Sequence, residues 1–138
     1  MHDLERLSDL TIEFYEKLSS WEQAVVRDCS ITLPQMHTLE ILGQQSPLRM
    51  KELAAKMGVT TGTLTVGIDR LEKQGLVTRI PHETDRRSIL VALTEAGQEL
   101  YREHHAHHLH LTREIQAALT PEETEQFASI LTKLTQAL

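Results

Sequence analysis

Five of the eight histidines in this 138-residue chain lie between residues 104 and 110. On a helix, residues four apart share one face with Cβ atoms about 5–6 Å apart, so His104 and His108 are close enough to bind one metal ion. His107 lies three residues from both His104 and His110, which leaves alternative pairs open. The spacing therefore predicts a metal site, to which His37 is a further candidate. The alternative is a solvated histidine face without a regulatory role.

A second set of side chains has types that suit contact with nucleic acid. Threonine hydroxyls at a helix start can hydrogen-bond bases or phosphates, helix cations contact phosphates, and arginines of a turn can enter a minor groove. The candidate DNA-contacting residues are Thr60, Thr61, Thr63, Thr65, Arg70, Lys73, Arg86 and Arg87. In the structural alternative, the threonines only start a helix, Arg70 pairs with Asp69 or Glu72, and Asp85 restrains one of the turn arginines.

The elements that position these side chains are predicted from apolar spacing, N-cap threonines, first-turn prolines and glycines that follow a last turn. The predicted helices cover residues 4–26, 32–42, 50–57, 59–74 and 94–118, and a last helix starts at 120–121. Residues 43–47 are predicted to be a turn. Two β-branched runs, 76–80 and 88–93, predict a hairpin with a charged tip at 81–87.

Composition excludes several classes of protein. Apolar residues make up 40% of the chain and charged residues 25%, which supports a folded core. A single cysteine excludes an internal disulfide and fits a reducing cytosol. No apolar stretch approaches the roughly 20 residues of a membrane span, and the first residues lack the apolar run of a signal peptide. We therefore expect a cytoplasmic protein that does not act at a membrane.

Charge is distributed unevenly along the chain. The formal net charge is −6, yet residues 49–93 carry eight Lys or Arg against five Asp or Glu, a balance of +3. The remaining residues carry −9. A basic middle between acidic arms is typical of a DNA reader on an acidic scaffold.

The predicted fold is mostly α-helical with a small β-hairpin wing, that is, a winged helix-turn-helix. The flanking helices are too long and too apolar to be covered by so small a middle, so a second copy of the chain is expected to cover them. The predicted organisation is an N-terminal dimerisation helix (1–31), a DNA-binding domain (32–93) and C-terminal dimerisation helices (94–138).

Several motifs together resemble the MarR family of bacterial transcription regulators. They are Leu53-Ala54, Ile68-Asp69-Arg70-Leu71-Glu72-Lys73-Gln74-Gly75-Leu76-Val77, the wing motif Asp85-Arg86-Arg87-Ser88, and Leu93-Thr94-Glu95-Ala96-Gly97. The resemblance covers nearly the whole chain. It implies a homodimer on a pseudo-palindromic operator, with recognition helices about 34 Å apart, and no RNA partner.

The histidines resemble those of the zinc-responsive branch of this family, which represses zinc-uptake genes. That resemblance implies a Zn(II) site of His104, His108 and His37, with Glu22 as the fourth ligand and Glu40 as its rival. Three imidazoles and one carboxylate suit tetrahedral zinc. The resemblance further implies that the metal-bound form holds the operator.

The same branch has a second metal site, to which Cys29 and Glu103 correspond here. Met36 stands where that branch has a glutamate, so this chain departs from the pattern. A cysteine beside a methionine favours Cu(I) instead, and copper or another transition metal is therefore the alternative to zinc.

Two rival functions follow from the same residues. A metalloenzyme is disfavoured, because residues 103–107 do not form the His-Glu-x-x-His pattern and neither a Ser/His/Asp arrangement nor a glycine-rich phosphate loop is present. The closer rival is a MarR-type repressor that is released by a small organic ligand or by oxidation of Cys29, with no regulatory role for the histidines.

Overall fold

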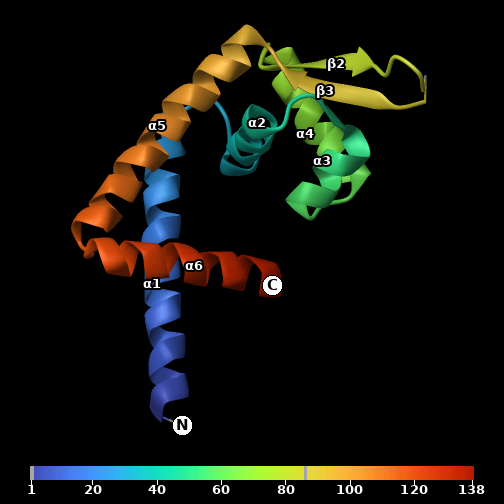
Figure 1. The fold of residues 1–138 in the computed structure, drawn as a ribbon. Helices are drawn as coiled ribbons and strands as arrows, with labels where there is room; N and C mark the ends of the chain where they lie inside the picture. The colour runs from blue at the N-terminus through green and yellow to red at the C-terminus, as the bar shows by residue number, and fades with distance from the viewer. Residues whose placement is uncertain (1, 86) are drawn as a thin grey trace. The chain divides into compact units, whose positions relative to one another are not determined.

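The computed structural model describes residues 2–85 and 87–138, and its helices and strands follow the predicted order with one added strand (Figure 1). The elements are α1 (His2–Val26), α2 (Leu33–Gln44), β1 (Leu48–Arg49), α3 (Met50–Met57), α4 (Thr61–Lys73), β2 (Val77–Pro81), β3 (Ile89–Leu93), α5 (Glu95–Ala117) and α6 (Pro121–Ala137). The chain divides into two compact units, Met1–Glu103 and His104–Leu138. Among the described residues, none of the helices has the length and apolar character needed to cross a membrane.

The core of the first unit is built from side chains at helical spacing on α2, α3 and α4, closed by the sheet. Met36, Leu39 and Leu42 recur every three residues on α2 and are fully enclosed. They pack in one cluster with the other fully buried apolar side chains, which are Leu53, Ile68, Leu71, Val77 and Val91. Burying each leucine or isoleucine contributes roughly 1.5–3 kcal/mol, so this cluster holds α4 in place.

Threonine N-caps begin four of the helices, as the sequence predicts for 32, 94 and 120. The hydroxyls of Thr32, Thr60, Thr94 and Thr120 accept the backbone N–H three residues later, at 3.3, 3.1, 3.1 and 3.1 Å. Each N-cap satisfies one of the N–H groups that a helix start leaves without a partner, and stabilises the helix by about 1 kcal/mol. Helix α4 accordingly begins at Thr61, with Thr60 as its N-cap.

The predicted hairpin is part of a three-stranded antiparallel sheet with the order β1-β3-β2. Residues Val77 to Pro81 of β2 pair with Leu93 to Ile89 of β3. Strand β1 pairs with the other edge of β3, with Leu48 opposite Val91. The sequence did not predict β1, because two residues are too few to show the alternation that marks a strand.

The Leu-Thr-x-x-Gly segment that follows β3 lies against the end of α4. Thr94 donates its N–H to the Leu76 carbonyl at 3.1 Å and its hydroxyl to the Gly75 carbonyl at 2.6 Å. A Cβ at Gly97 would overlap the carbonyl oxygen of Leu76. Only glycine lets the start of α5 lie this close to the Leu76 backbone, so Gly97 determines where α5 begins relative to the sheet.

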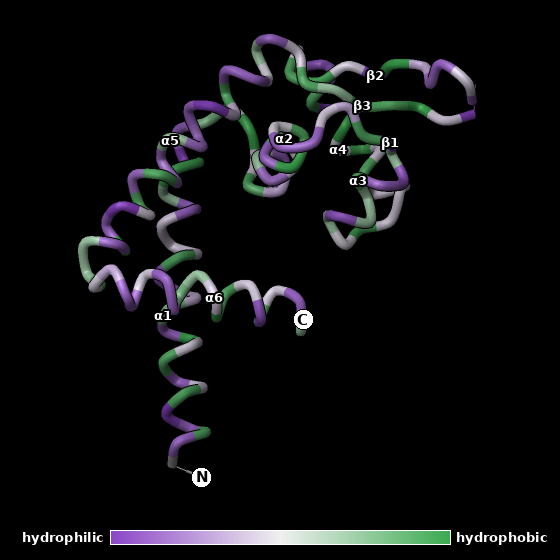
Figure 2. Tube along the Cα trace, viewed as in Figure 1, coloured by the Kyte–Doolittle hydropathy of each residue, from purple (hydrophilic) through white to green (hydrophobic). Residues whose placement is uncertain are grey.

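Apolar side chains remain uncovered on the long helices of both units. In the first unit, α1 exposes Leu4, Leu7 and Leu10 to 73%, 63% and 51%, and Figure 2 shows its hydrophobic positions spaced between hydrophilic ones. In the second unit, α6 has no buried residue and exposes Ile130 and Leu134. Such stripes are typical of helices that pack against another chain.

Candidate functional site

The threonine-rich start of α4 lies on the surface, and its hydroxyls have different local roles. Thr60, Thr61, Thr63 and Thr65 are all exposed. The Thr60 hydroxyl both caps the helix and donates to Thr63 Oγ1 at 3.1 Å, and Thr65 Oγ1 donates to the Thr61 carbonyl at 2.7 Å. Within the described chain, the Thr61 side chain makes no hydrogen bond, which leaves its hydroxyl available to a ligand.

Arg70 and Lys73 lie in the last turn of α4, where both are exposed. Neither forms an ion pair with another described residue. Asp69 and Glu72, the alternative partners of Arg70, bind Arg79 instead: Nη2 of Arg79 lies 2.6 Å from Asp69 Oδ1 and Nη1 lies 2.8 Å from Glu72 Oε1. Both cations of α4 are therefore free to meet phosphates.

Arg79 was not singled out from the sequence, and it joins the wing to α4. Its pKa is raised, first because Asp69 accepts a hydrogen bond from the charged guanidinium, and further through the charge of Glu72. Its backbone N–H also donates to Glu72 Oε2 at 3.3 Å. The hairpin is thus attached to the helix that carries the threonines.

The wing loop is organised by two acceptors, Asp85 and His82. Asp85 accepts the backbone N–H of Arg87 and the hydroxyl of Ser88, each at 3.0 Å, and these bonds, the first above all, lower the pKa of its carboxyl. His82 Nδ1 lies 3.2 Å from the N–H of Thr84 and 3.1 Å from that of Asp85. Among the described residues, Asp85 therefore holds the Arg87 backbone and forms no ion pair with its guanidinium.

Arg87 itself is exposed, which suits contact with DNA. The second predicted wing contact, Arg86, lies outside the described residues. Arg87 thus places a cation on the surface of the wing, next to the loop that the Asp85 and His82 hydrogen bonds shape.

In the second unit, His104 and His108 lie side by side on α5. Their Nε2 atoms are 3.0 Å apart, and their ring centroids are 4.7 Å apart at 75°. Two nitrogen ligands of a tetrahedral zinc ion with bonds of 2.0–2.1 Å lie about 3.3–3.4 Å apart, so a small change of rotamer would let both imidazoles bind one ion. His104 is buried and His108 half-buried, whereas the other three histidines of this stretch, His105, His107 and His110, are exposed.

The remaining metal candidates lie in the first unit. His37 is exposed on α2, Glu40 is half-buried one turn later, and Glu22 is half-buried on α1. Cys29 is half-buried, with its thiol 3.9 Å from the Val25 carbonyl, and Glu103 is exposed. The Met36 side chain lies in the hydrophobic core, which leaves its thioether away from the surface.

Helix α3, the turn at Gly58, helix α4 and the β2–β3 hairpin together form a winged helix-turn-helix, and this fold defines a DNA-binding regulator. A sequence model of the MarR family matches residues 31–89. The HTH-type transcriptional regulator YfiV of Bacillus subtilis, itself uncharacterised, is 38% identical over 109 residues, which cover 78% of this chain and 68% of YfiV. The chain belongs to the MarR family of transcription regulators.

Two further relatives bear on regulation and on DNA. The organic hydroperoxide resistance transcriptional regulator of Bacillus subtilis is 41% identical over 68 residues, which span 49% of this chain and 46% of that protein. The crystal structure of Streptococcus pneumoniae FabT in complex with DNA superposes with a TM-score of 0.89 at 25% identity, and the alignment covers 96% of this chain and 95% of FabT. The similarity to FabT confirms the predicted fold class.

Proposed function

We propose that this MarR-family regulator is a homodimeric repressor whose binding to operator DNA is promoted by Zn(II), and that it controls metal-uptake genes. The observation that carries the metal part of the proposal is the His104–His108 pair, whose Nε2 atoms lie 3.0 Å apart. Imidazole is the commonest metal ligand among protein side chains, and a pair four residues apart on a helix is already oriented for chelation.

Binding to DNA is supported by the exposed threonines of α4 and by the similarity to FabT in its DNA complex. It is also supported by Arg70 and Lys73, which form no ion pair with another described residue. Dimerisation is supported by the uncovered leucines of α1 and by the apolar side chains exposed on α6. A symmetric dimer presents two copies of α4, so the operator is expected to be pseudo-palindromic, with half-sites about one helical turn apart.

His37 and one carboxylate, Glu22 or Glu40, complete the proposed ligand set with the histidine pair. Bound zinc supplies a fixed coordination sphere. If bound metal promotes operator binding, metal affinity and DNA affinity are coupled reciprocally, typically by 1–3 kcal/mol.

Fluorescence anisotropy tests this function on a duplex taken from the DNA upstream of the protein's own gene, first with EDTA and then with increasing free zinc. We expect the wild type to bind more tightly as zinc rises, and the His104→Ala/His108→Ala variant to lose this dependence while remaining folded. The His107→Ala/His110→Ala variant removes two exposed histidines of the same helix and is expected to respond like the wild type. Undiminished zinc dependence in the His104→Ala/His108→Ala variant would exclude these two histidines as the regulatory zinc ligands.

A second candidate signal is an organic ligand or oxidation at Cys29, which is supported by the similarity to the organic hydroperoxide resistance regulator. The half-buried Cys29 thiol is the only thiol of the chain. If this function holds, cumene hydroperoxide releases the DNA from the wild type, dithiothreitol restores binding, and Cys29→Ser abolishes the response. Zinc and EDTA would then have no effect on binding.

A further inference from the structure

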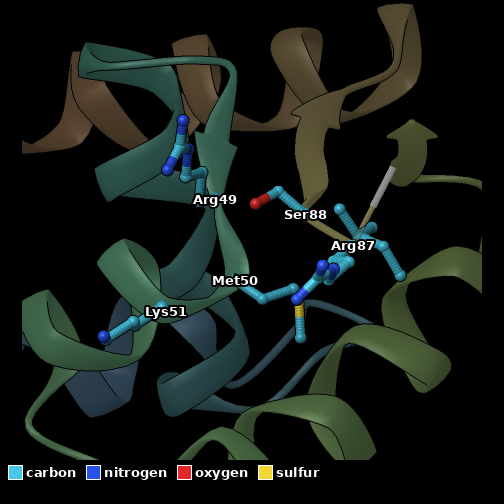
Figure 3. Close-up of a pocket in the computed structure, with 6 residues that line it drawn as sticks. Arg49, Met50, Lys51, Arg87 and Ser88 are labelled. Atoms are coloured by element: carbon cyan, nitrogen blue, oxygen red, sulfur yellow. The ribbon is translucent and has the colours of Figure 1, made fainter. Parts of the chain in front are cut away.

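A basic pocket of about 170 Å³ opens between the start of α3 and the base of the wing. It is lined by Arg49, Met50 and Lys51 on one side and by Arg87, Ser88 and Ile89 on the other (Figure 3). A water molecule takes up about 30 Å³ in the liquid, so the pocket has room for a small hydrated anion.

The pocket exists because β1 pairs with β3. Arg49 lies opposite Leu90 at the last position of this pairing. Beyond it, β1 continues into α3, and the segment before β3 belongs to the wing loop. Lys51 and Ser88 are therefore brought close together although they are 37 positions apart in the sequence. A ligand held there would contact the helix-turn-helix and the wing at once.

Among the described residues, the lining carries three cations and no carboxylate, in a chain whose formal net charge is −6. Lys51 and the Arg87 side chain form no ion pair with any described residue. Arg49 Nε lies 3.9 Å from Glu52 Oε1, and its Nη2 lies 3.2 Å from His82 Nε2. Such a concentration of positive charge favours an anion and repels other cations.

The polar groups of the pocket suit a phosphate better than a base edge. The Ser88 hydroxyl, the only neutral side-chain donor among the described lining residues, already donates to Asp85. The part of the lining that the structure describes offers no amide or carboxylate side chain, and these are the groups that read adenine and cytosine edges. The other polar groups of the described lining are the charged ends of long side chains. Such cations contact DNA phosphates and so position a protein on the duplex without reading its base sequence.

We propose that this pocket binds one backbone phosphate of the DNA duplex, with Lys51, Arg49 and Arg87 as its cationic contacts. The proposal rests on the DNA-binding function of the family. It assigns the start of α3 a role in holding the wing and the helix-turn-helix on the same DNA strand. Arg87 contributes to this contact from the wing side.

Lys51→Gln is the cleanest test, because Arg49 also contacts His82 and its loss would disturb the wing. Binding is measured on a duplex that the wild type has enriched from a random-sequence pool, at several salt concentrations. Each protomer of the dimer loses one phosphate contact, and each lost contact lowers the slope of log affinity against log salt by about 0.9, so the slope of Lys51→Gln is lower by about 1.8. Wild-type affinity therefore falls about 12-fold more than that of Lys51→Gln between 50 and 200 mM salt. Lys56→Gln removes the same charge from the last turn of α3, outside the pocket, and is expected to leave the slope unchanged.

Replacing single phosphates of the duplex by neutral methylphosphonates then locates the contact. The wild type should lose affinity at one position in each half-site where Lys51→Gln loses none. Equal losses for both proteins at every position, with an unchanged salt slope, would overturn the proposal. A third result would come from adding millimolar inorganic phosphate at constant ionic strength. If phosphate weakens DNA binding by the wild type but not by Lys51→Gln, and both proteins lose equal affinity at every methylphosphonate position, the pocket binds a free anion and the proposal is also overturned. Failure of the wild type to enrich any duplex would instead refute the DNA-binding function itself.

Discussion

Arg79 on strand β2 donates from Nη2 to Asp69 Oδ1 on helix α4 at 2.6 Å. The second arm of the same guanidinium reaches Glu72 one turn along the helix at 2.8 Å. Because Asp69 and Glu72 would repel each other without a cation between them, the arginine both connects the two elements and neutralises the helix face. The wing and the helix that presents the threonines are therefore held as one piece.

We predict that Arg79→Gln lowers the free energy of unfolding by about 1–2 kcal/mol, because two charge-assisted hydrogen bonds are lost and two neighbouring carboxylates remain. Urea denaturation measures the change. Arg79→Lys keeps the charge but reaches only one carboxylate at a time, and should recover part of the loss. If Arg79→Gln and Asp69→Asn have effects that simply add in the double variant, the two residues do not interact in solution.

Gly97→Ala is expected to destabilise the fold by about 2 kcal/mol or more, because the new Cβ overlaps the Leu76 carbonyl oxygen, which is backbone and cannot rotate away. Gly67 is the matched control. It lies inside α4, and a Cβ there meets nothing within 4 Å. Gly67→Ala should therefore stabilise the protein by about 1 kcal/mol through helix propensity. Thermal unfolding of both variants measures these changes in stability. A Gly97→Ala variant as stable as the wild type would show that α5 does not depend on the close contact between Gly97 and the Leu76 carbonyl.

The order of the helices and the hairpin could be predicted because their signals are local. Thr32 with Pro34, and Thr120 with Pro121, are start signals that each lie within a few residues. Strand β1 could not be predicted, because Leu48 and Arg49 become a strand only through pairing with Leu90 and Val91, more than forty positions away. Long-range pairing of so short a segment leaves no periodic pattern in the sequence.

The candidate DNA-contacting residues could be proposed from their types, but their present partners could not. Arg79 follows an acidic pair by seven and ten positions, and only the turn at Gly75 brings the three side chains together. Lys51 has the sequence context of an ordinary surface lysine, and only the pairing of β1 with β3 brings it into the lining of the same pocket as Arg87. The proposed metal ligands in the first unit, which include His37 and Glu22, stay predictions.

Thr60 and Thr61 are adjacent threonines for which we predict opposite phenotypes. Thr60→Ala removes the N-cap acceptor of the Thr63 N–H and should cost about 1 kcal/mol of stability. Thr61→Ala removes a side chain without a hydrogen-bond partner in the described chain, so stability should stay within about 0.5 kcal/mol while affinity for DNA falls. Urea denaturation and anisotropy on the enriched duplex separate the two effects. Unchanged DNA affinity in Thr61→Ala would remove this residue from the interface.

The wing loop is expected to loosen in acid through Asp85. The bonds from Arg87 N–H and the Ser88 hydroxyl hold the pKa of this carboxyl below its ordinary value of 3.8. A lowered folded-state pKa means that the contribution to stability is complete above the unfolded-state pKa and is lost as the pH falls through the folded-state pKa. The loop should therefore keep its structure above about pH 4 and lose it progressively below that value.

The amide resonance of Arg87, followed by NMR from pH 7 to pH 2, is expected to move towards its random-coil position as Asp85 is protonated. Asp85→Asn removes the titrating group, so its Arg87 resonance should show no transition of this kind. Glu83→Gln, which removes an exposed carboxylate from the same loop, should titrate like the wild type. A wild-type Arg87 resonance that stays constant until global unfolding would mean that the Asp85 hydrogen bonds do not organise the wing.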